Sequence, residues 1–263
     1  MQFRQYLSNN NPIQEFYKTQ RSTHTIHFVK YLQSKYHSFS HKISIQNCFN
    51  ALNNLIDISD PDINLPNIHH LLQTAQAIRN DGHPDWLQLV GLIHDLGKII
   101  YLKGCNEDGT SMNQQWSIVG DTFVVGCKLP DNIVYKEFNQ LNPDMQDDRY
   151  NTEYGIYHPN CGLDNCYISY GHDEYLYQVL KFNNCTIPEK GLYMIRYHSL
   201  YPWHKYNEYE HLMNDKDREY KKWVQLFNQY DLYTKENIEM NVEELMKYYQ
   251  PIIEKYIGNH IFI

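Results

Sequence analysis

Six side chains between residues 70 and 231 carry the chemistry of a metal site. Four of them are imidazoles, two are carboxylates, and none is a thiolate. The six residues are His70, His94, Asp95, His172, His198 and Asp231. This number of ligands is too large for one metal ion and about right for two. Because imidazole and carboxylate without thiolate suit iron, manganese or zinc, the sequence predicts a dinuclear site for one of these metals.

The strongest single signal is the dipeptide His94-Asp95, which lies inside the apolar, helix-patterned segment 86–101. Adjacent helical residues are about 100° apart, so both side chains can lean toward one pocket. Lys98 falls on the same helix face. Gly97 costs about 1 kcal/mol relative to alanine within a helix, which indicates that another group approaches closely there. The alternative is an exposed ion pair between Asp95 and Lys98, but apolar residues flank the dipeptide.

His70 and His172 give weaker signals when each is taken alone. His70 opens the helical pattern HLLQTAQAIR, where the preceding His69 is an alternative ligand. Apolar residues follow His172 at three, four and seven positions, on its own face of a helix. The imidazole of His172 is therefore expected to face the core, where an unpaired ring would be costly. A core histidine bonded to a carbonyl is the alternative.

The last two candidates lie in the C-terminal third of the chain. His198 follows Ile195 by three residues, and the nearby His204 is expected to be exposed. Asp231 borders the apolar stripe of the segment WVQLFNQYDLY, so its carboxylate must be paired, protonated or bound to a metal. Lys235 offers an ordinary ion pair with Asp231, four residues along a helix. Together the six residues fit a helix bundle whose helices project ligands inward.

Composition narrows the class of protein. The 263 residues are 42% hydrophobic, with a formal net charge of -8. The negative charge argues against nucleic-acid and membrane-surface partners, which would need a basic face. None of the six cysteines has the C-x-x-C spacing of a zinc or redox motif, and residues 1–10 contain no apolar signal segment. We expect a cytoplasmic, monomeric protein that acts on a small molecule.

The hydrophobic pattern is helical nearly throughout, and strand signals are weak. Helices are predicted at 43–57, 67–79, 85–101, 114–125, 131–139, 172–183, 189–200, 215–230 and 240–257. Residues 102–113 are predicted to form a turn. Residues 141–171 are predicted to be an ordered loop, because they hold five tyrosines and long loops in compact domains are usually functional. The prediction is one all-α domain over residues 1–263, a helical bundle with long covering loops.

Seven blocks of the sequence resemble the myo-inositol oxygenase family, in order and over nearly the whole chain. The blocks are SDPD at 59–62, HLLQTA at 70–75, LVGLIHDLGK at 89–98, QWSIVGDTF at 115–123, YGHDEY at 170–175, RYHSLYPWH at 196–204 and FNQYDLYTK at 227–235. The resemblance implies a variant of the HD-domain helical fold with a mixed-valence di-iron centre, Fe(II)/Fe(III). It also implies ring cleavage of myo-inositol by O2, which yields D-glucuronate and water.

The resemblance further implies a role for each motif residue. One iron would be bound by His70, His94 and Asp231, and the second by His172 and His198, with Asp95 as the bridge. Lys98 would act as the catalytic residue by touching the reacting hydroxyl. The remaining substrate contacts would come from Arg4, Asp57, Ile58, Ser59, Gly120, Asp121, His198 and Ser199. Tyr17 and Lys235 would help close or support the site, and the N-terminus and residues 141–171 would cover it.

Two other functions remain open from the residues themselves. An HD-domain phosphohydrolase would use the same His-Asp pair with a metal ion to activate water, and it would need a basic, phosphate-binding pocket. A degenerate helical domain could serve as a binding module, but it would have lost ligands, whereas all six are present.

Overall fold

The computed structural model describes residues 12–59, 65–233 and 239–263. Within these ranges the regular structure is mainly α-helical, which confirms the predicted all-α class. The α-helices are α1 (Pro12–Thr23), α2 (Ile26–Tyr36), α3 (Ile45–Leu52), α4 (Asn67–Asn80), α5 (Asp85–Ile93), α6 (His172–Phe182), α7 (Glu189–Tyr197), α8 (Tyr201–His204), α9 (Asp215–Tyr233) and α10 (Val242–Tyr256).

Short 3-10 helices and strands complete the regular structure of the described ranges. The 3-10 helices are η1 (Leu96–Leu102), η2 (Lys136–Leu141), η3 (Pro143–Gln146), η4 (Leu163–Asn165) and η5 (Glu210–Leu212). The strands form two antiparallel pairs, β1 (Lys42–Ser44) with β4 (His260–Phe262) and β2 (Val124–Val125) with β3 (Tyr167–Ile168).

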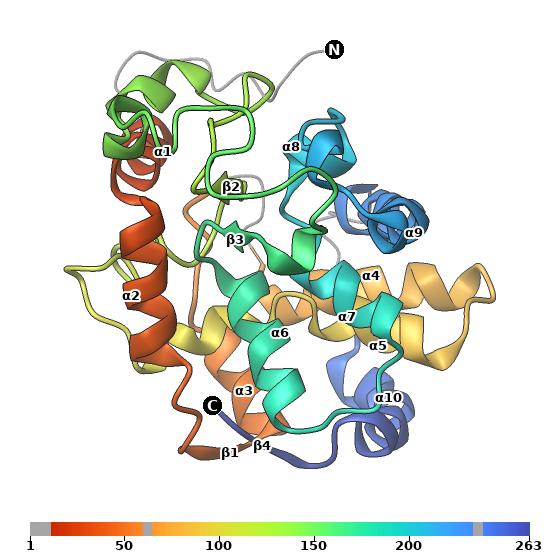
Figure 1. Cartoon of the computed structure of the whole chain (residues 1–263). Coiled ribbons are helices and arrows are strands. Elements are labelled where there is room, and N and C mark those ends of the chain that lie inside the picture. Colours follow the sequence, from red (N-terminus) through yellow and green to blue (C-terminus); the bar gives the residue numbers. More distant parts are fainter. Residues whose placement is uncertain (1–11, 60–64, 234–238) are drawn as a thin grey trace.

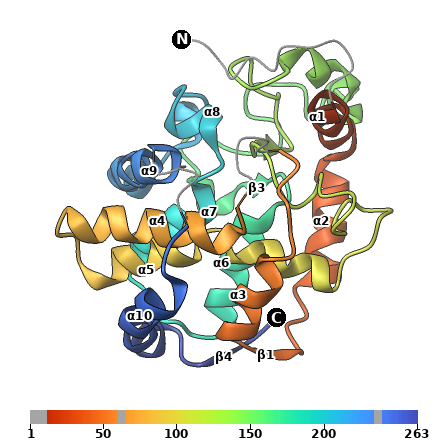
Figure 2. The same ribbon diagram turned by 180° about the vertical axis from the view of Figure 1, so that it is seen from behind.

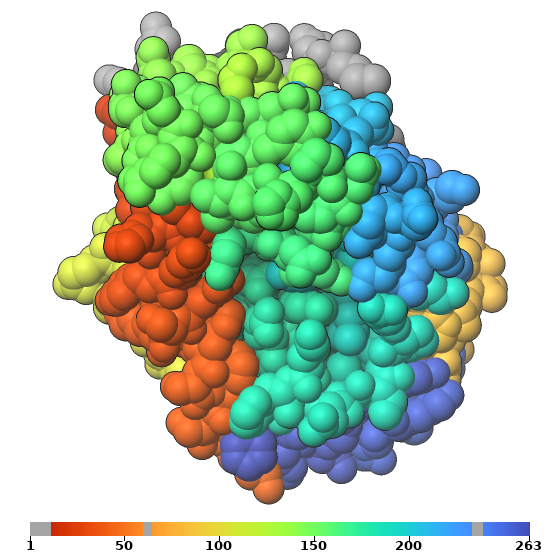
Figure 3. Space-filling model, in the orientation of Figure 1, coloured from red at the N-terminus to blue at the C-terminus, as the bar shows by residue number. Residues whose placement is uncertain are grey.

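Helices α4 to α7 form the centre of the fold, with α4 against α5, α6 against α7, and η1 against α6 (Figure 1). Helix α9 packs on α4, α5 and α7, and α10 packs on α4 and α5, as the reverse view also shows (Figure 2). Helices α1 and α2 lie on the opposite side from α9. The green segment that includes η2 and η3 covers the upper part of the face shown in Figure 3.

A large hydrophobic core joins the ends of the described chain. It contains Ile13 of α1 and the final residue, Ile263, both of which are buried. A smaller cluster joins α2 to residues 123–133. The two ends of the described chain therefore share one core, while a single domain over residues 1–263 stays a prediction. Among the described residues, no helix has the length and apolar character needed to cross a bilayer.

The predicted helix at 114–125 is wrong. The segment forms turns, bends and irregular backbone, and it ends in β2. It keeps a few local bonds, such as that from the amide of Val119 to the carbonyl of Gln115, but the carbonyl of Ile118 accepts the backbone amide of His172, and the amide of Thr122 donates to the carbonyl of Ser199. These tertiary bonds use groups that a continuous helix would pair internally, so they outweigh the local apolar pattern.

The predicted helix at 131–139 is also wrong. Tyr135 has a left-handed φ of 52°, and the segment gives only the 3-10 helix η2.

The prediction for 43–57 was too long, because β1 occupies the first two of these residues and α3 ends at Leu52. Helices α1 and α2 were not predicted from the sequence. The remaining helix predictions, and the turn at 102–113, agree with the structure to within a few residues.

The predicted helix at 85–101 is interrupted at the dipeptide His94-Asp95. Helix α5 ends at Ile93, and η1 starts at Leu96. The break follows from the packing of η1 on α6, which depends on Gly97. A Cβ added at Gly97 would lie 1.9 Å from the carbonyl oxygen of His172. The missing side chain therefore allows η1 to touch the start of α6.

We predict that Gly97→Ala lowers the free energy of unfolding by about 3 kcal/mol or more, at the upper end of overpacking effects, because a backbone carbonyl cannot move aside cheaply. Denaturant unfolding of the chelator-treated protein measures this change. The control is Gly82→Ala, since a Cβ there has nothing within 4 Å and meets only the strain of a φ of 74°. Equal losses in the two variants would contradict the proposed contact.

Candidate metal centre

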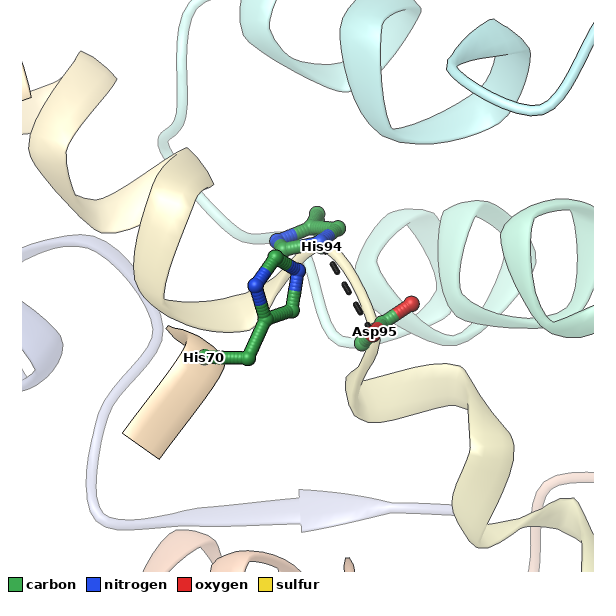
Figure 4. Close-up of side chains that lie close together, drawn as sticks. All are labelled: His70, His94 and Asp95. Atoms are coloured by element: carbon green, nitrogen blue, oxygen red, sulfur yellow. Dashed lines mark ion pairs between the residues drawn. The ribbon is translucent and has the colours of Figure 1, made fainter. Parts of the chain in front are cut away.

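The six predicted ligands converge from six elements. His70 lies in α4 and Asp231 in α9, and His172 is the first residue of α6. His94 and His198 are the C-cap residues of α5 and α7, and Asp95 precedes η1. All six side chains are buried. Figure 4 shows three of them, His70, His94 and Asp95, pointing toward one another.

Two groups of three ligand atoms meet the spacing of a metal site. One group is His70, His94 and Asp95, and the other is Asp95, His172 and His198. Within each group the ligand atoms lie within 4.8 Å of one another. Because Asp95 belongs to both groups, its carboxylate is placed between two neighbouring sites.

Asp231 completes the first group. Its Oδ1 is 3.0 Å from Nε2 of His70 and 3.2 Å from Nε2 of His94. In the second group, Oδ1 of Asp95 is 3.1 Å from Nε2 of His172. Atoms that bind one ion at about 2.0–2.2 Å lie about 3 Å apart when the bonds are at right angles. The observed spacings therefore fit shared ions.

Three of the imidazoles are held by backbone carbonyls on their outer nitrogen. Nδ1 of His94 donates to the carbonyl of Gly91 at 2.9 Å. Nδ1 of His198 donates to the carbonyl of Ile195 at 2.8 Å. His172 donates in the same way to Ile118, at 2.7 Å. Such bonds fix the tautomer and direct Nε2 toward a metal. The carbonyl bond expected as an alternative role for His172 is thus present together with its ligand geometry.

The inner nitrogens lack the partners that buried polar atoms require. Among the described residues, Nε2 of His94 has no hydrogen-bond partner. Nε2 of His172 faces Nε2 of His198 at 3.0 Å, and this contact can hold only one proton. Buried polar atoms without partners are costly, and bound cations would satisfy the inward-facing nitrogens. The donor set therefore fits metal binding.

The electrostatics favour the ligand forms of His198 and Asp95. Burial, together with the charges of His172 and His94, lowers the pKa of His198 to about 3. Burial opposes ionisation of Asp95, but Lys98 and the nearby imidazoles outweigh it and hold the pKa of Asp95 well below its usual value. The centre therefore presents a neutral imidazole and an ionised carboxylate at neutral pH.

Lys98 joins the metal ligands to a second carboxylate. Its Nζ is 2.8 Å from Oδ2 of Asp95 and 2.7 Å from Oδ2 of Asp57. Burial disfavours the ammonium, but these two carboxylates prevail and raise the pKa of Lys98. Asp57 also accepts hydrogen bonds from the amide and hydroxyl of Ser59. The exposed ion pair proposed as an alternative for Asp95 and Lys98 is excluded, because both residues are buried.

A cavity of about 420 Å³ opens beside these groups. The predicted site residues that line it are Tyr17, Asp57, Ser59, His70, Asp95, Lys98, Gly120, Asp121, His172, His198, Ser199 and Asp231. Ile58 is not among the lining residues, and its side chain is 40% exposed. Arg4 and Lys235 lie outside the described residues. His69 is engaged elsewhere, because its Nδ1 accepts the amide of Met240.

No residue of the loop 141–171 lines the cavity, and its role as a cover stays a prediction. Its tyrosines hold other parts of the fold; the hydroxyl of Tyr157, for example, donates to the carbonyl of Val125. Among the lining residues that sequence reasoning missed are three that lie shortly after the candidate ligand His198 in the chain: Tyr201, Lys205 and Tyr206. Their proximity to a ligand in sequence was the available signal.

His204 is buried, which corrects the prediction that it is exposed. Burial lowers its pKa to about 4, so the ring is neutral and its Nε2–H donates to the carbonyl of His198 at 2.9 Å. The backbone carbonyl of His204 accepts a hydrogen bond from the side-chain amide of Gln225 in α9. His204 thus supports the backbone of a candidate ligand.

Comparison with known proteins gives matches along nearly the whole chain. Residues 10–263 match the family model described as Myo-inositol oxygenase. Inositol oxygenase of Danio rerio is 48% identical over 244 residues, which are 91% of this chain and 84% of the relative. Inositol oxygenase 1 of Arabidopsis thaliana is 47% identical over 252 residues, which are 95% of this chain and 79% of the relative. Inositol oxygenase of Dictyostelium discoideum is 43% identical over 268 residues, and the match covers 99% of this chain and 89% of the relative.

We predict that His204→Ala weakens metal binding about 10- to 100-fold, the usual effect of removing a group that supports a ligand, while the chain still folds. Metal content after dialysis against graded chelator concentrations measures this change. His211→Ala is the control, because His211 also bonds a carbonyl, that of Glu153, on an exposed loop. Unchanged metal retention in His204→Ala would contradict the supporting role.

Proposed function

The chain belongs to the myo-inositol oxygenase family, and we propose that it cleaves the ring of myo-inositol with O2 to give D-glucuronate and water, a four-electron oxidation. The family match confirms the resemblance seen in the seven sequence blocks. The observation that carries the proposal is the pair of buried ligand groups sharing Asp95, beside a cavity that Lys98 lines. The activity follows from the family, and the site provides the groups that this activity needs.

We assign the ligands of two iron ions from the two groups. His70, His94 and Asp231 would hold one ion, His172 and His198 would hold the other, and Asp95 would bridge them. Bound iron, as a mixed-valence Fe(II)/Fe(III) pair, would supply O2 activation and electron transfer, which zinc cannot because it has no redox chemistry. The sharing of Asp95 by both ligand groups supports the bridge.

Lys98 would act on the reacting hydroxyl of the substrate. Its ammonium lines the cavity and touches the proposed bridging residue Asp95. A fixed positive charge favours a deprotonated hydroxyl over a neutral one. Asp57 holds the ammonium from its other side, so its charge is positioned before the substrate enters.

The other cavity residues would select the polyol by its hydroxyls. Asp57, Ser59, Asp121 and Ser199 bring carboxylates and hydroxyls to the cavity, and Gly120 brings backbone without a side chain. A site built to bond hydroxyls rejects analogues that lack one. Tyr17 of α1 lines the same cavity, which supports its proposed part in closing the site. The roles of Arg4 and Lys235 remain predictions.

The phosphohydrolase alternative is less well supported by the charge of the cavity. Among the described lining residues, Lys98 and Lys205 are the lysines and there is no arginine, whereas Asp57, Asp95, Asp121 and Asp231 are acidic. Lys98 is already paired with two of these carboxylates. A phosphate group would therefore depend on the metal ions for its binding, whereas a neutral polyol needs no basic pocket.

We also propose that the protein is a cytoplasmic monomer. All six cysteines are free thiols, which is typical of a reducing compartment. The six proposed ligands and the cavity lie within one chain, so the site needs no residue from a second subunit. A net charge of -8 agrees with the absence of a nucleic-acid partner.

We expect the purified protein, loaded with iron under anaerobic conditions and partly oxidised, to form D-glucuronate when myo-inositol and O2 are added. Product analysis together with O2 consumption measures the reaction, and spin counting tests for a coupled iron pair. Hydrolysis of phosphate esters with manganese or magnesium, while inositol stays inert, would favour the alternative enzyme. A single bound zinc with neither activity would refute both.

We predict different losses for the ligand His94 and for the catalytic residue Lys98. His94→Ala should lose iron and activity together. Lys98→Ala should keep its iron but lose about 100-fold or more in turnover, as when a charge-stabilising donor is removed. Iron content and initial rate are measured on the same samples. Lys247→Ala is the control, because Lys247 forms an exposed ion pair on α10, and full activity in an iron-replete Lys98→Ala variant would refute the assigned role.

A further inference from the structure

Cys161 and Cys166 bring two free thiols into contact outside the cavity of the candidate metal centre. Their sulfur atoms are 3.7 Å apart, and neither residue lines the cavity. We propose that these two residues form a reversible disulfide when hydrogen peroxide oxidises Cys161, and that Cys166 thereby protects Cys161 from irreversible oxidation. This inference is independent of the proposed enzymatic activity.

The fold holds the two thiols face to face. The amide of Gly162 donates to the carbonyl of Leu212 at 2.8 Å, and the amide of Leu163 donates to Oδ2 of Asp217 at 3.0 Å. Gly162 has a φ of 87°, and a Cβ there would lie 2.1 Å from the side chain of Asn214. The turn between the cysteines is therefore fixed against η5 and α9.

Fixing the turn gives each thiol a high effective concentration of the other. A disulfide requires a sulfur–sulfur distance of about 2.0 Å, so the sulfurs must approach from 3.7 Å. Because the turn is anchored through its backbone amides, rotation of the two side chains is the simplest way to close this gap.

The two cysteines differ in their access to an oxidant. Cys161 is partly exposed, whereas Cys166 is buried and directs its thiol toward the carbonyl of Gly162. A peroxide molecule from solvent therefore meets Cys161 first. Burial, reinforced by Cys161, raises the pKa of Cys166, which favours its thiol form and makes it the less reactive of the two toward peroxide.

The reaction balances in two steps. The thiol of Cys161 reacts with hydrogen peroxide to give a sulfenic acid and one water molecule. The thiol of Cys166 then attacks the sulfenic sulfur, which forms the S–S bond and releases a second water. Peroxide is the oxidant that is reduced, and a thiol reductant restores both cysteines. Without a neighbouring thiol, a sulfenic acid can proceed to the sulfinic acid, which ordinary thiols do not reverse.

Cys127 is the rival partner. Cys127 is 1% exposed. Burial raises the pKa of Cys127, and the nearby Cys161 raises it further. However, the sulfur contact of Cys161 is with Cys166, not Cys127. The structure therefore assigns Cys166 as the partner that reacts.

The test treats the full-length purified protein with graded hydrogen peroxide, quenches with catalase, and maps each cysteine by peptide mass spectrometry before and after dithiothreitol. We expect the wild type to show a Cys161–Cys166 disulfide that dithiothreitol reverses. In Cys166→Ala, Cys161 should instead accumulate sulfinic and sulfonic acid, which dithiothreitol does not remove. The variant removes one small apolar group, and its circular dichroism spectrum shows whether it has folded.

Two internal controls are present in the same chain. Cys105 and Cys185 are also partly exposed, and among the described residues neither has another cysteine sulfur as a hydrogen-bond partner. Both should be oxidised beyond sulfenic acid to the same extent in the wild type and in Cys166→Ala. A Cys127–Cys161 disulfide in the wild type, or oxidation of Cys161 that is unaffected by Cys166→Ala, would overturn the proposal.

Discussion

The close contact between η1 and the start of α6 is the constraint on which the rest of the site depends. Gly97 lacks the Cβ that would overlap the His172 carbonyl, so the two elements can touch. This contact puts Asp95 against His172, at 3.1 Å, and gives the two ligand groups their common member. The break in the helix at His94-Asp95 belongs to the same arrangement, because η1 turns away from the axis of α5 to reach α6.

Charge explains why the centre suits cations. Two carboxylates, those of Asp57 and Asp95, bind the ammonium of Lys98, and a third, that of Asp231, lies against the imidazoles of His70 and His94. Uncompensated buried charge is strongly unfavourable, and bound cations offset the remaining negative charge. The same lysine lies between a proposed metal ligand and the substrate cavity. The proposed metal site and the cavity are therefore linked through one hydrogen-bonded chain, from Asp57 through Lys98 to Asp95.

The backbone contributes as much as the ligand side chains. Carbonyls of Gly91, Ile118 and Ile195 orient three imidazoles, and His204 holds the carbonyl of His198. Ile118 belongs to the segment 114–125, where an apolar pattern predicted a helix. A helix would have used that carbonyl internally, so the irregular conformation is what makes it available to His172. A wrong prediction of secondary structure thus falls at a place where function needs irregular backbone.

The sequence by itself determined the candidate ligand types, the helical class and the family, because residue chemistry, hydrophobic period and family-like blocks are local properties of the chain. It also indicated that Gly97 permits a close approach, since a helical glycine has a cost. Only the tertiary structure decided what approaches Gly97, that His70 rather than His69 faces the centre, and that His204 is buried. These facts depend on which elements pack together, and packing joins residues that are far apart in the sequence. Local pattern carries no information on such partners.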